Sequence, residues 1–94
     1  DVGPIALFCR DAGGRVTIVE VKRVRAVAAA VEQVVRYREQ VERDPELAPA
    51  RAVVVAPDFA PQARALALTR DVELIALDVA ALRAEAEENA LRLF

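Results

Sequence analysis

The sequence predicts a single α/β domain in which a mixed β-sheet is flanked by helices, in the order β-β-α-β-α-β-α. Two short apolar segments near the start are joined by a glycine-containing turn, which is typical of a β-hairpin. After the hairpin, amphipathic helix-like stretches alternate with short apolar runs. The chain has 94 residues, of which 55% are hydrophobic, so it is long enough for one core and too short for two domains.

The first elements in the chain form the predicted hairpin. The apolar run 5–9 is followed by the turn sequence 11–14, which contains aspartate and two glycines. Residues 15–23 are rich in β-branched side chains and form the second strand of the hairpin.

The central part of the chain predicts a helix and then a buried strand. Residues 26–43 contain neither Gly nor Pro and place valines at helical intervals beside charged side chains, as an amphipathic helix does. The run 52–56 is apolar at every position and ends at Pro57, which is typical of a central strand covered on both sides. Helices are therefore expected on both faces of the sheet.

The C-terminal part predicts a helix, a strand and a last helix. Pro61 lies near the first turn of a helix that runs to about Arg70. Residues 74–77 form another buried strand, and Asp78 can cap a helix that begins at Val79.

The composition excludes several classes of function. The chain has no histidine and one cysteine, Cys9, so it cannot form a tetrahedral zinc site, a Ser-His-Asp triad, a Cys-His dyad or an internal disulfide on its own. No apolar run is long enough for a membrane span and no signal-peptide pattern opens the chain, so a cytoplasmic protein is expected. A net charge of −2 argues against a protein that coats nucleic acid through bulk electrostatics.

Glu20 and Lys22 bring charge to the end of the second predicted strand. Because side chains alternate along a strand, both share one face with the apolar residues Val16 and Ile18. Lys22 is also the only lysine in the chain. Considered alone, this pattern is typical of a strand that leaves the core and ends in a solvated ion pair.

Gln33 and Tyr37 lie one helical turn apart in the helix that follows. Both are beside the apolar stripe, so they can face the sheet edge that carries Glu20 and Lys22. The alternative is the flank of an amphipathic helix with a half-buried tyrosine.

The order and spacing of these residues resemble a nuclease family. Residues 3–7 (Gly-Pro-Ile-Ala-Leu), residues 20–22 (Glu-Val-Lys) and Gln33 followed by Arg36-Tyr37 are similar to motifs of the RecB-like PD-(D/E)XK nucleases. The chain also resembles, essentially from end to end, the catalytic domain of the NucS/EndoMS mismatch-specific endonucleases. The further segments that carry this resemblance are 47–51, 61–64 and 91–94.

The resemblance implies a restriction-endonuclease-like fold and a DNA endonuclease that uses Mg²⁺ or Mn²⁺. Such an ion polarises the phosphate and acidifies a water, and it needs oxygen ligands. By this resemblance Glu20 and the backbone carbonyl of Val21 are metal ligands, and Lys22 positions the attacking water or stabilises charge on the phosphate. Gln33 and Tyr37 would orient the scissile strand or the lysine.

Ala6 departs from the family pattern, which has a metal-binding aspartate at this position. One carboxylate, one carbonyl and waters offer too little negative charge to compete with the hydration of a hard cation. An inactive or nearly inactive form with a weakly bound metal or none is therefore expected, and either a deliberate substitution or a natural loss would explain the alanine. The alternative function is a non-catalytic module that binds DNA or a sliding clamp.

Three arginines are candidate DNA contacts, because they lie near the second predicted strand and its charged end; surface arginines are otherwise commonly only solvated. These residues are Arg15, Arg23 and Arg25. By the same resemblance, a DNA-sensing, dimer-forming domain precedes this segment. The full-length protein is therefore expected to be a homodimer that acts on mismatched or branched DNA in mismatch repair.

Residues 1–84 are expected to form the nuclease domain and residues 85–94 a flexible C-terminal tail. The ending 90–94 resembles the Gln-Leu-x-Leu-Phe peptides with which bacterial replication proteins bind the sliding clamp, with Ala90 in place of the glutamine. The clamp-binding anchors would be Leu91, Leu93 and Phe94. The alternative is that the tail folds back over its own core and covers a strand edge.

Overall fold

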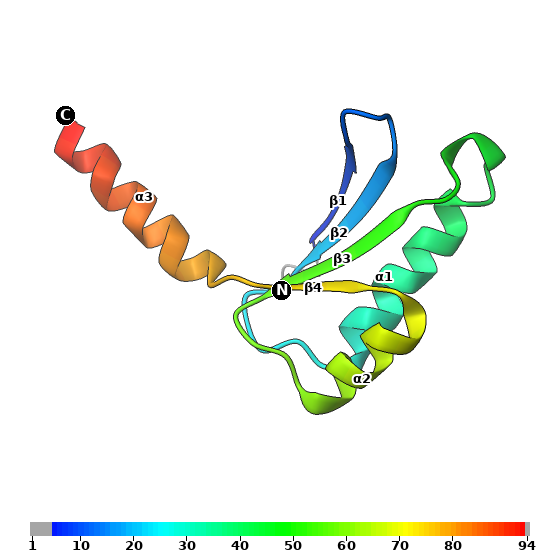
Figure 1. Cartoon of the computed structure of the whole chain (residues 1–94). Coiled ribbons are helices and arrows are strands. Elements are labelled where there is room, and N and C mark those ends of the chain that lie inside the picture. Colours follow the sequence, from blue (N-terminus) through cyan, green and yellow to red (C-terminus); the bar gives the residue numbers. More distant parts are fainter. Residues whose placement is uncertain (1–4, 94) are drawn as a thin grey trace.

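The structure of the chain is a computed structural model that describes residues 5–93. A four-stranded sheet in the order β1-β2-β3-β4 packs against two helices, and a third helix leads away from it (Figure 1). The predicted α/β class and order of strands and helices are confirmed, and one short 3₁₀ helix, η1, is added. In chain order the elements are β1 (Ile5–Arg10), β2 (Val16–Val21), α1 (Ala28–Val41), η1 (Pro45–Leu47), β3 (Arg51–Ala56), α2 (Pro61–Arg70), β4 (Glu73–Ala76) and α3 (Val79–Leu93).

The sheet is mixed, because β1 is antiparallel to β2 while β2, β3 and β4 are parallel. The turn between β1 and β2 is fixed by Asp11, whose Oδ1 accepts hydrogen bonds from the backbone N–H groups of Gly13 at 2.9 Å and Arg15 at 2.8 Å. This turn sets a register in which Ala6 lies directly opposite Glu20.

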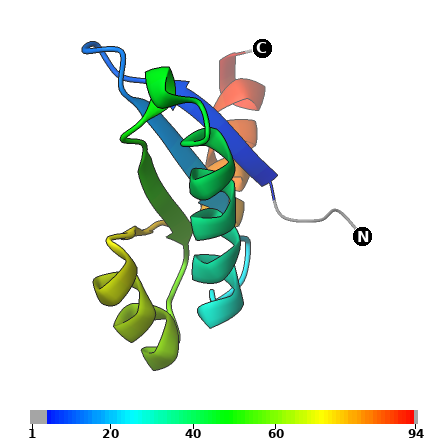
Figure 2. The ribbon, with the colours of Figure 1, turned by 90° about the vertical axis from the view of Figure 1, so that its right-hand side faces the viewer.

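Helices α1 and α2 pack on the same face of the sheet, whereas the sequence led us to expect helices on both faces. The connections β2-α1-β3 and β3-α2-β4 step in the same direction across the sheet. Because such crossovers are right-handed, both helices must lie on one side. Figure 2 shows α1 in front of the strands on this side.

The core lies between this face of the sheet and the two helices. Ile18 of β2 and Val54 of β3 are fully buried against Val31 and Val34 of α1 and Ala63 of α2. The alternating burial along β2 agrees with the alternation predicted from the sequence.

The opposite face of the sheet is apolar and partly open in the described chain. Val53 of β3 is buried there, but Leu7 of β1 and Ile75 of β4 remain exposed. The apolar run predicted to be covered on both sides is thus covered by helices on one side, since α3 makes no extensive contact with the sheet.

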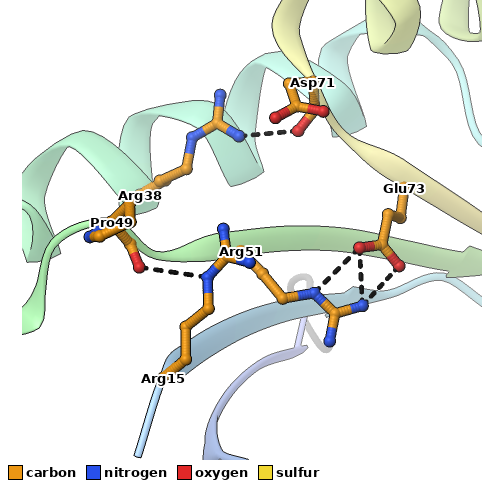
Figure 3. A network of polar contacts seen from close by, with 6 residues as sticks. All are labelled: Arg15, Arg38, Pro49, Arg51, Asp71 and Glu73. Atoms are coloured by element: carbon orange, nitrogen blue, oxygen red, sulfur yellow. Dashed lines mark hydrogen bonds and ion pairs between the residues drawn. The ribbon is translucent and has the colours of Figure 1, made fainter. Parts of the chain in front are cut away.

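Arginine side chains hold the neighbouring elements together (Figure 3). Arg51 of β3 forms hydrogen bonds of 2.6 to 2.9 Å with both carboxylate oxygens of Glu73 on β4. Arg38 of α1 donates to the carbonyl oxygens of Arg70 at 2.6 Å and Asp71 at 2.9 Å, at the C-terminal end of α2. These carbonyls have no partner within the helix, so the arginine both caps α2 and ties it to α1.

Helix α3 extends further than the expected domain boundary. Asp78 caps its start as predicted, with Oδ1 accepting from the N–H of Ala81 at 3.0 Å. The helix then runs to Leu93, so residues 85–93 continue α3 where a separate flexible tail was expected. Phe94 and the side chains of Leu91 and Leu93 lie outside the described part. No helix among the described residues is long and apolar enough to cross a membrane.

Candidate functional site

A buried carboxylate lies near the end of β2. Buried and half-buried residues alternate along β2, so Glu20 faces the same side as Ile18 and is 0% exposed. Neither Oε1 nor Oε2 has a hydrogen-bond partner among the described residues. Buried polar groups in folded proteins are almost always partnered, so this carboxylate calls for an explanation and is a candidate for a functional group.

Two opposing effects act on the charge of Glu20. Burial raises the pKa of its carboxyl above the ordinary value of 4.5, because the charged form loses its hydration. The nearby Lys22 ammonium favours the carboxylate and lowers that pKa. The effect of Lys22 is smaller than that of burial, so the pKa is raised overall. Lys22 follows the last residue of β2, where its backbone N–H donates to the carbonyl oxygen of Val55 at 2.8 Å. The acid and the amine therefore lie close together at the end of the strand.

Position 6 lies beside the buried carboxylate. In the antiparallel pair of β1 and β2, Ala6 is directly opposite Glu20. Side chains of directly opposed residues share a face, with Cβ atoms about 4.5–5.5 Å apart. The methyl group of Ala6 thus occupies the place from which a longer acidic side chain would meet the Glu20 carboxylate.

Gln33 and Tyr37 are joined to each other on α1. The Nε2 of Gln33 donates to the hydroxyl oxygen of Tyr37 at 2.8 Å, and Arg36 Nη2 donates to the Oε1 of Gln33 at 2.5 Å. These two bonds fix which end of the Gln33 amide faces Tyr37. Gln33 and Arg36 also line the same surface hollow as Lys22, whereas Tyr37 packs against the core.

Arg36 was given no role in the sequence analysis. Its spacing of three residues from Gln33 is compatible with a contact on one helix face, but many pairs share that spacing. Only the structure shows that its guanidinium holds the Gln33 oxygen and lines the hollow beside Lys22.

The three candidate DNA-binding arginines lie in different places. Arg25 lines the hollow beside Lys22, and its Nε is 3.2 Å from Oδ2 of Asp58. Arg23 lies on the same connection and lines a second hollow together with Arg83 of α3.

The expected placement of Arg15 near the charged end of the strand is wrong. Arg15 precedes the first residue of β2, whereas Glu20 and Lys22 are at its other end. Its Nε donates to the carbonyl oxygen of Pro49 at 3.3 Å, which ties the hairpin to the loop before β3 (Figure 3). The three arginines were grouped by their nearness to this strand in the sequence, which does not distinguish its two ends.

The residues present supply only part of a site for a divalent metal ion. Glu20 offers two unpartnered oxygens, and the backbone carbonyl of Val21 is adjacent in sequence. Opposite them stands the methyl group of Ala6, which offers no ligand. Among the described residues, no group of three or more His, Cys, Asp or Glu side chains is arranged to hold a metal ion. The donor set therefore does not fit a hard divalent cation, which needs several oxygen ligands.

The whole chain, residues 1–94, matches the model of a protein family described as the endonuclease NucS C-terminal domain. Proteins named endonuclease NucS from Streptomyces griseus and Streptomyces coelicolor are 46% and 47% identical to it over 93 residues. These alignments cover 99% of this chain but 41% of either relative, so the chain spans less than half the length of those proteins.

Solved structures described as EndoMS or as a repair endonuclease have a similar fold. A structure described as EndoMS in apo form superimposes with a TM-score of 0.75 and 30% identity, over 82% of this chain and 33% of that one. A structure described as an EndoMS–dsDNA2 complex has a TM-score of 0.68 and 31% identity, over 76% of this chain and 29% of that one. A repair endonuclease from Pyrococcus abyssi has a TM-score of 0.70 and 27% identity, over 76% and 31%.

Proposed function

Because the chain belongs to the family of NucS C-terminal endonuclease domains, we propose that it is the phosphodiester-cleaving domain of a DNA endonuclease that acts on mismatched or branched DNA in mismatch repair. In this form the metal site is one carboxylate short, so cleavage is strongly impaired. Relatives named as endonucleases, and the relative described in complex with dsDNA, support the reaction class and the substrate.

One observation carries this proposal. The buried Glu20 carboxylate has no hydrogen-bond partner in the part of the chain that the structure describes, and it lies opposite Ala6 in the sheet register. A protein bears the cost of a buried, unpaired carboxylate where function requires it. Lys22 lies beside the carboxylate, and in this proposal its ammonium stabilises the negative charge that develops on the phosphate.

Gln33 and Tyr37 have a supporting role in the proposed site. The Gln33 amide is held between Arg36 and Tyr37, so its orientation is set before any substrate arrives. It shares a hollow with Lys22, which suits a residue that orients the scissile strand or the lysine.

A second function is favoured by the methyl group at position 6. The chain would then be a binding module that kept the nuclease fold, lost the chemistry and contributes DNA or clamp contacts to a larger assembly. This function predicts DNA binding without cleavage, even after the missing carboxylate is restored.

Restoring the carboxylate tests the two functions against each other. In the complete protein, Ala6→Asp is expected to raise Mg²⁺- or Mn²⁺-dependent cleavage of a mismatched DNA duplex by on the order of a hundredfold or more. Ala6→Asn is the matched control, because it has the same size without the charge. Adding Lys22→Ala to Ala6→Asp should remove the restored activity. Absence of cleavage by Ala6→Asp, with DNA affinity retained, would instead establish the binding module.

We also propose two partners of the complete protein. The upstream part of the protein forms a homodimer, and the C-terminal residues Leu91, Leu93 and Phe94 bind a sliding clamp, which would tether the enzyme to replicating DNA. Deleting Leu93 and Phe94 is expected to abolish clamp association in a pull-down with purified clamp. Leu82→Ser is the matched control, because Leu82 is an exposed leucine on the same helix. Undiminished clamp binding by the deletion variant would eliminate this contact.

A further inference from the structure

A surface hollow of about 480 Å³ lies between the β2–α1 connection and the first turns of α1. Its charged lining consists of the three cations Lys22, Arg25 and Arg36, and Gln33 is its one amide. The remaining lining residues are valines and alanines, and none of the described residues that line the hollow carries a carboxylate. Lys22, whose charge acts on the buried Glu20 carboxyl, is one of its lining residues.

The charges of this hollow favour an anionic occupant. The chain as a whole carries a net charge of −2, but the charge around this hollow is positive. The three cations repel each other. Arg25 is partly neutralised by Asp58 outside the hollow, while Arg36 is exposed and uses one nitrogen on the neutral Gln33. A ligand with repeated negative charges would relieve this repulsion.

Two of the apolar side chains that line the hollow are largely exposed to solvent. Val24 is 70% exposed and Val27 is 54% exposed. Val27 is also the N-cap of α1, with an extended backbone (φ −106°, ψ 175°) and no side-chain hydrogen bond. Ser, Thr, Asp or Asn at an N-cap stabilises a helix by about 1 kcal/mol relative to an aliphatic residue. Neither burial nor capping accounts for valine here, whereas contact with an apolar part of a ligand does.

We propose that this hollow binds the sugar–phosphate backbone of one DNA strand. Arg25 and Arg36 contact neighbouring phosphates, and Val24 and Val27 pack against the deoxyribose between them, which lacks the polar 2′-hydroxyl of RNA. The strand bound in this way leads to Lys22 and Glu20. This inference rests on the proposed function and names the surface through which the substrate reaches that site.

The electrostatic half of the proposal is tested by DNA binding in the complete protein. Fluorescence anisotropy with a labelled mismatched DNA duplex is measured over a series of salt concentrations. Arg36→Gln is expected to weaken binding about tenfold and to lower the salt dependence by about one released ion. Arg43→Gln is the matched control, because Arg43 is exposed beyond the other end of α1. Its affinity should equal that of the unsubstituted protein.

The proposed apolar contact with deoxyribose is tested with Val24→Ser. Val24 is exposed, so this substitution leaves the core unchanged. It is expected to weaken DNA binding several-fold with an unchanged salt dependence, because no charge is removed. The unsubstituted protein should bind the DNA duplex more tightly than an RNA duplex of the same sequence, and Val24→Ser should narrow that difference. Wild-type affinity and salt dependence in both Arg36→Gln and Val24→Ser would overturn the proposal, as would equal affinity for RNA and DNA in the unsubstituted protein.

The experiments distinguish failure of this DNA-binding proposal from failure of the proposed nuclease function. If Ala6→Asp does not cleave while Arg36→Gln and Val24→Ser lose affinity, the hollow binds DNA in a protein that is no nuclease. If Ala6→Asp cleaves and both hollow variants bind normally, the strand reaches the site by another surface.

Discussion

At the scale of single residues, the carboxylate of Glu20 opposes folding. Burial strips the charged form of its hydration, which raises the pKa of the group above 4.5, and no described residue within 5–93 donates a hydrogen bond to it. As the pH rises above 4.5, the unfolded chain loses this proton before the folded chain does. The free energy of unfolding therefore falls with rising pH until the pH has passed the raised pKa of the folded state.

Glu20→Gln removes this charge and should stabilise the protein at neutral pH. We expect a gain of about 1 kcal/mol in the free energy of unfolding, because the neutral amide costs less to bury than the carboxylate. The gain should shrink as the pH falls toward 4.5, because the raised pKa of Glu20 leaves progressively more of the buried carboxyl protonated in the folded protein. Urea denaturation at the two pH values measures it.

Glu32→Gln serves as the control, since Glu32 is an exposed glutamate on α1. It should change stability by less than about 0.5 kcal/mol at either pH. A gain from Glu20→Gln that is the same at both pH values would contradict the account of a buried charge.

The sequence predicted the positions of some site side chains and not of others. The proximity of Glu20 and Lys22 follows from strand alternation, which is a local rule. The contact of Arg36 with Gln33 and the exposure of Val27 depend on rotamers and on packing between elements, which local rules do not determine. Arg15 was misplaced because it was grouped by its nearness to the strand, yet it lies before the first residue of β2 while Glu20 and Lys22 lie at the other end.

At the scale of elements, the β1–β2 turn determines whether position 6 meets Glu20. A shift of one residue in this register would move Ala6 to the other face of the sheet. Gly14 has a φ of +84°, a conformation that glycine adopts readily and other residues do not. The turn chemistry is therefore part of the site, although it lies at the far end of the hairpin.

Gly14→Ala should lower the free energy of unfolding by about 1–2 kcal/mol. No atom of the described residues lies within 4 Å of the added Cβ, so the cost comes from the backbone. Thermal denaturation measures it, with Gly13→Ala as the control, because Gly13 has no positive φ and its added Cβ would be 3.4 Å from Asp11 Oδ1. Equal stability of the two variants would refute a left-handed Gly14.

A substitution at the N-cap of α1 is predicted to stabilise the protein and to weaken its binding to DNA. Val27→Ser supplies the missing N-cap and should raise the free energy of unfolding by about 1 kcal/mol. The same substitution removes an apolar contact from the proposed DNA-binding hollow, so DNA affinity in fluorescence anisotropy should fall. If stability and affinity rise together, valine at this position is not explained by DNA contact.

The order of the elements could be predicted because turns, prolines and apolar periodicity are local signals. The face on which each helix packs could not be taken from the apolar run 52–56, because the handedness of the two crossovers decides it. The end of α3 was predicted too early for a different reason. Residues 85–93 were expected to be a flexible tail, yet they lack a strong helix-stop signal, and Glu, Ala and Leu all favour helices.

At the scale of the whole molecule, the domain has two layers and a one-sided core. Among the described residues, α1 and α2 pack on one face of the sheet and against each other. The candidate site lies at the margin of this core, where β2 ends and α1 begins. This position lets Glu20 be buried while Lys22 and the hollow remain accessible to a large substrate.

The central claim is that position 6 and Glu20 form a single site that now lacks one carboxylate. Calorimetric titration of Mn²⁺ into the complete protein tests this most directly, since it requires neither substrate nor turnover. We predict no saturable binding for the unsubstituted protein or for Ala6→Asn, and saturable binding for Ala6→Asp that disappears when Glu20→Gln is added. Binding by Ala6→Asp that is no tighter than that of Ala6→Asn would contradict the claim.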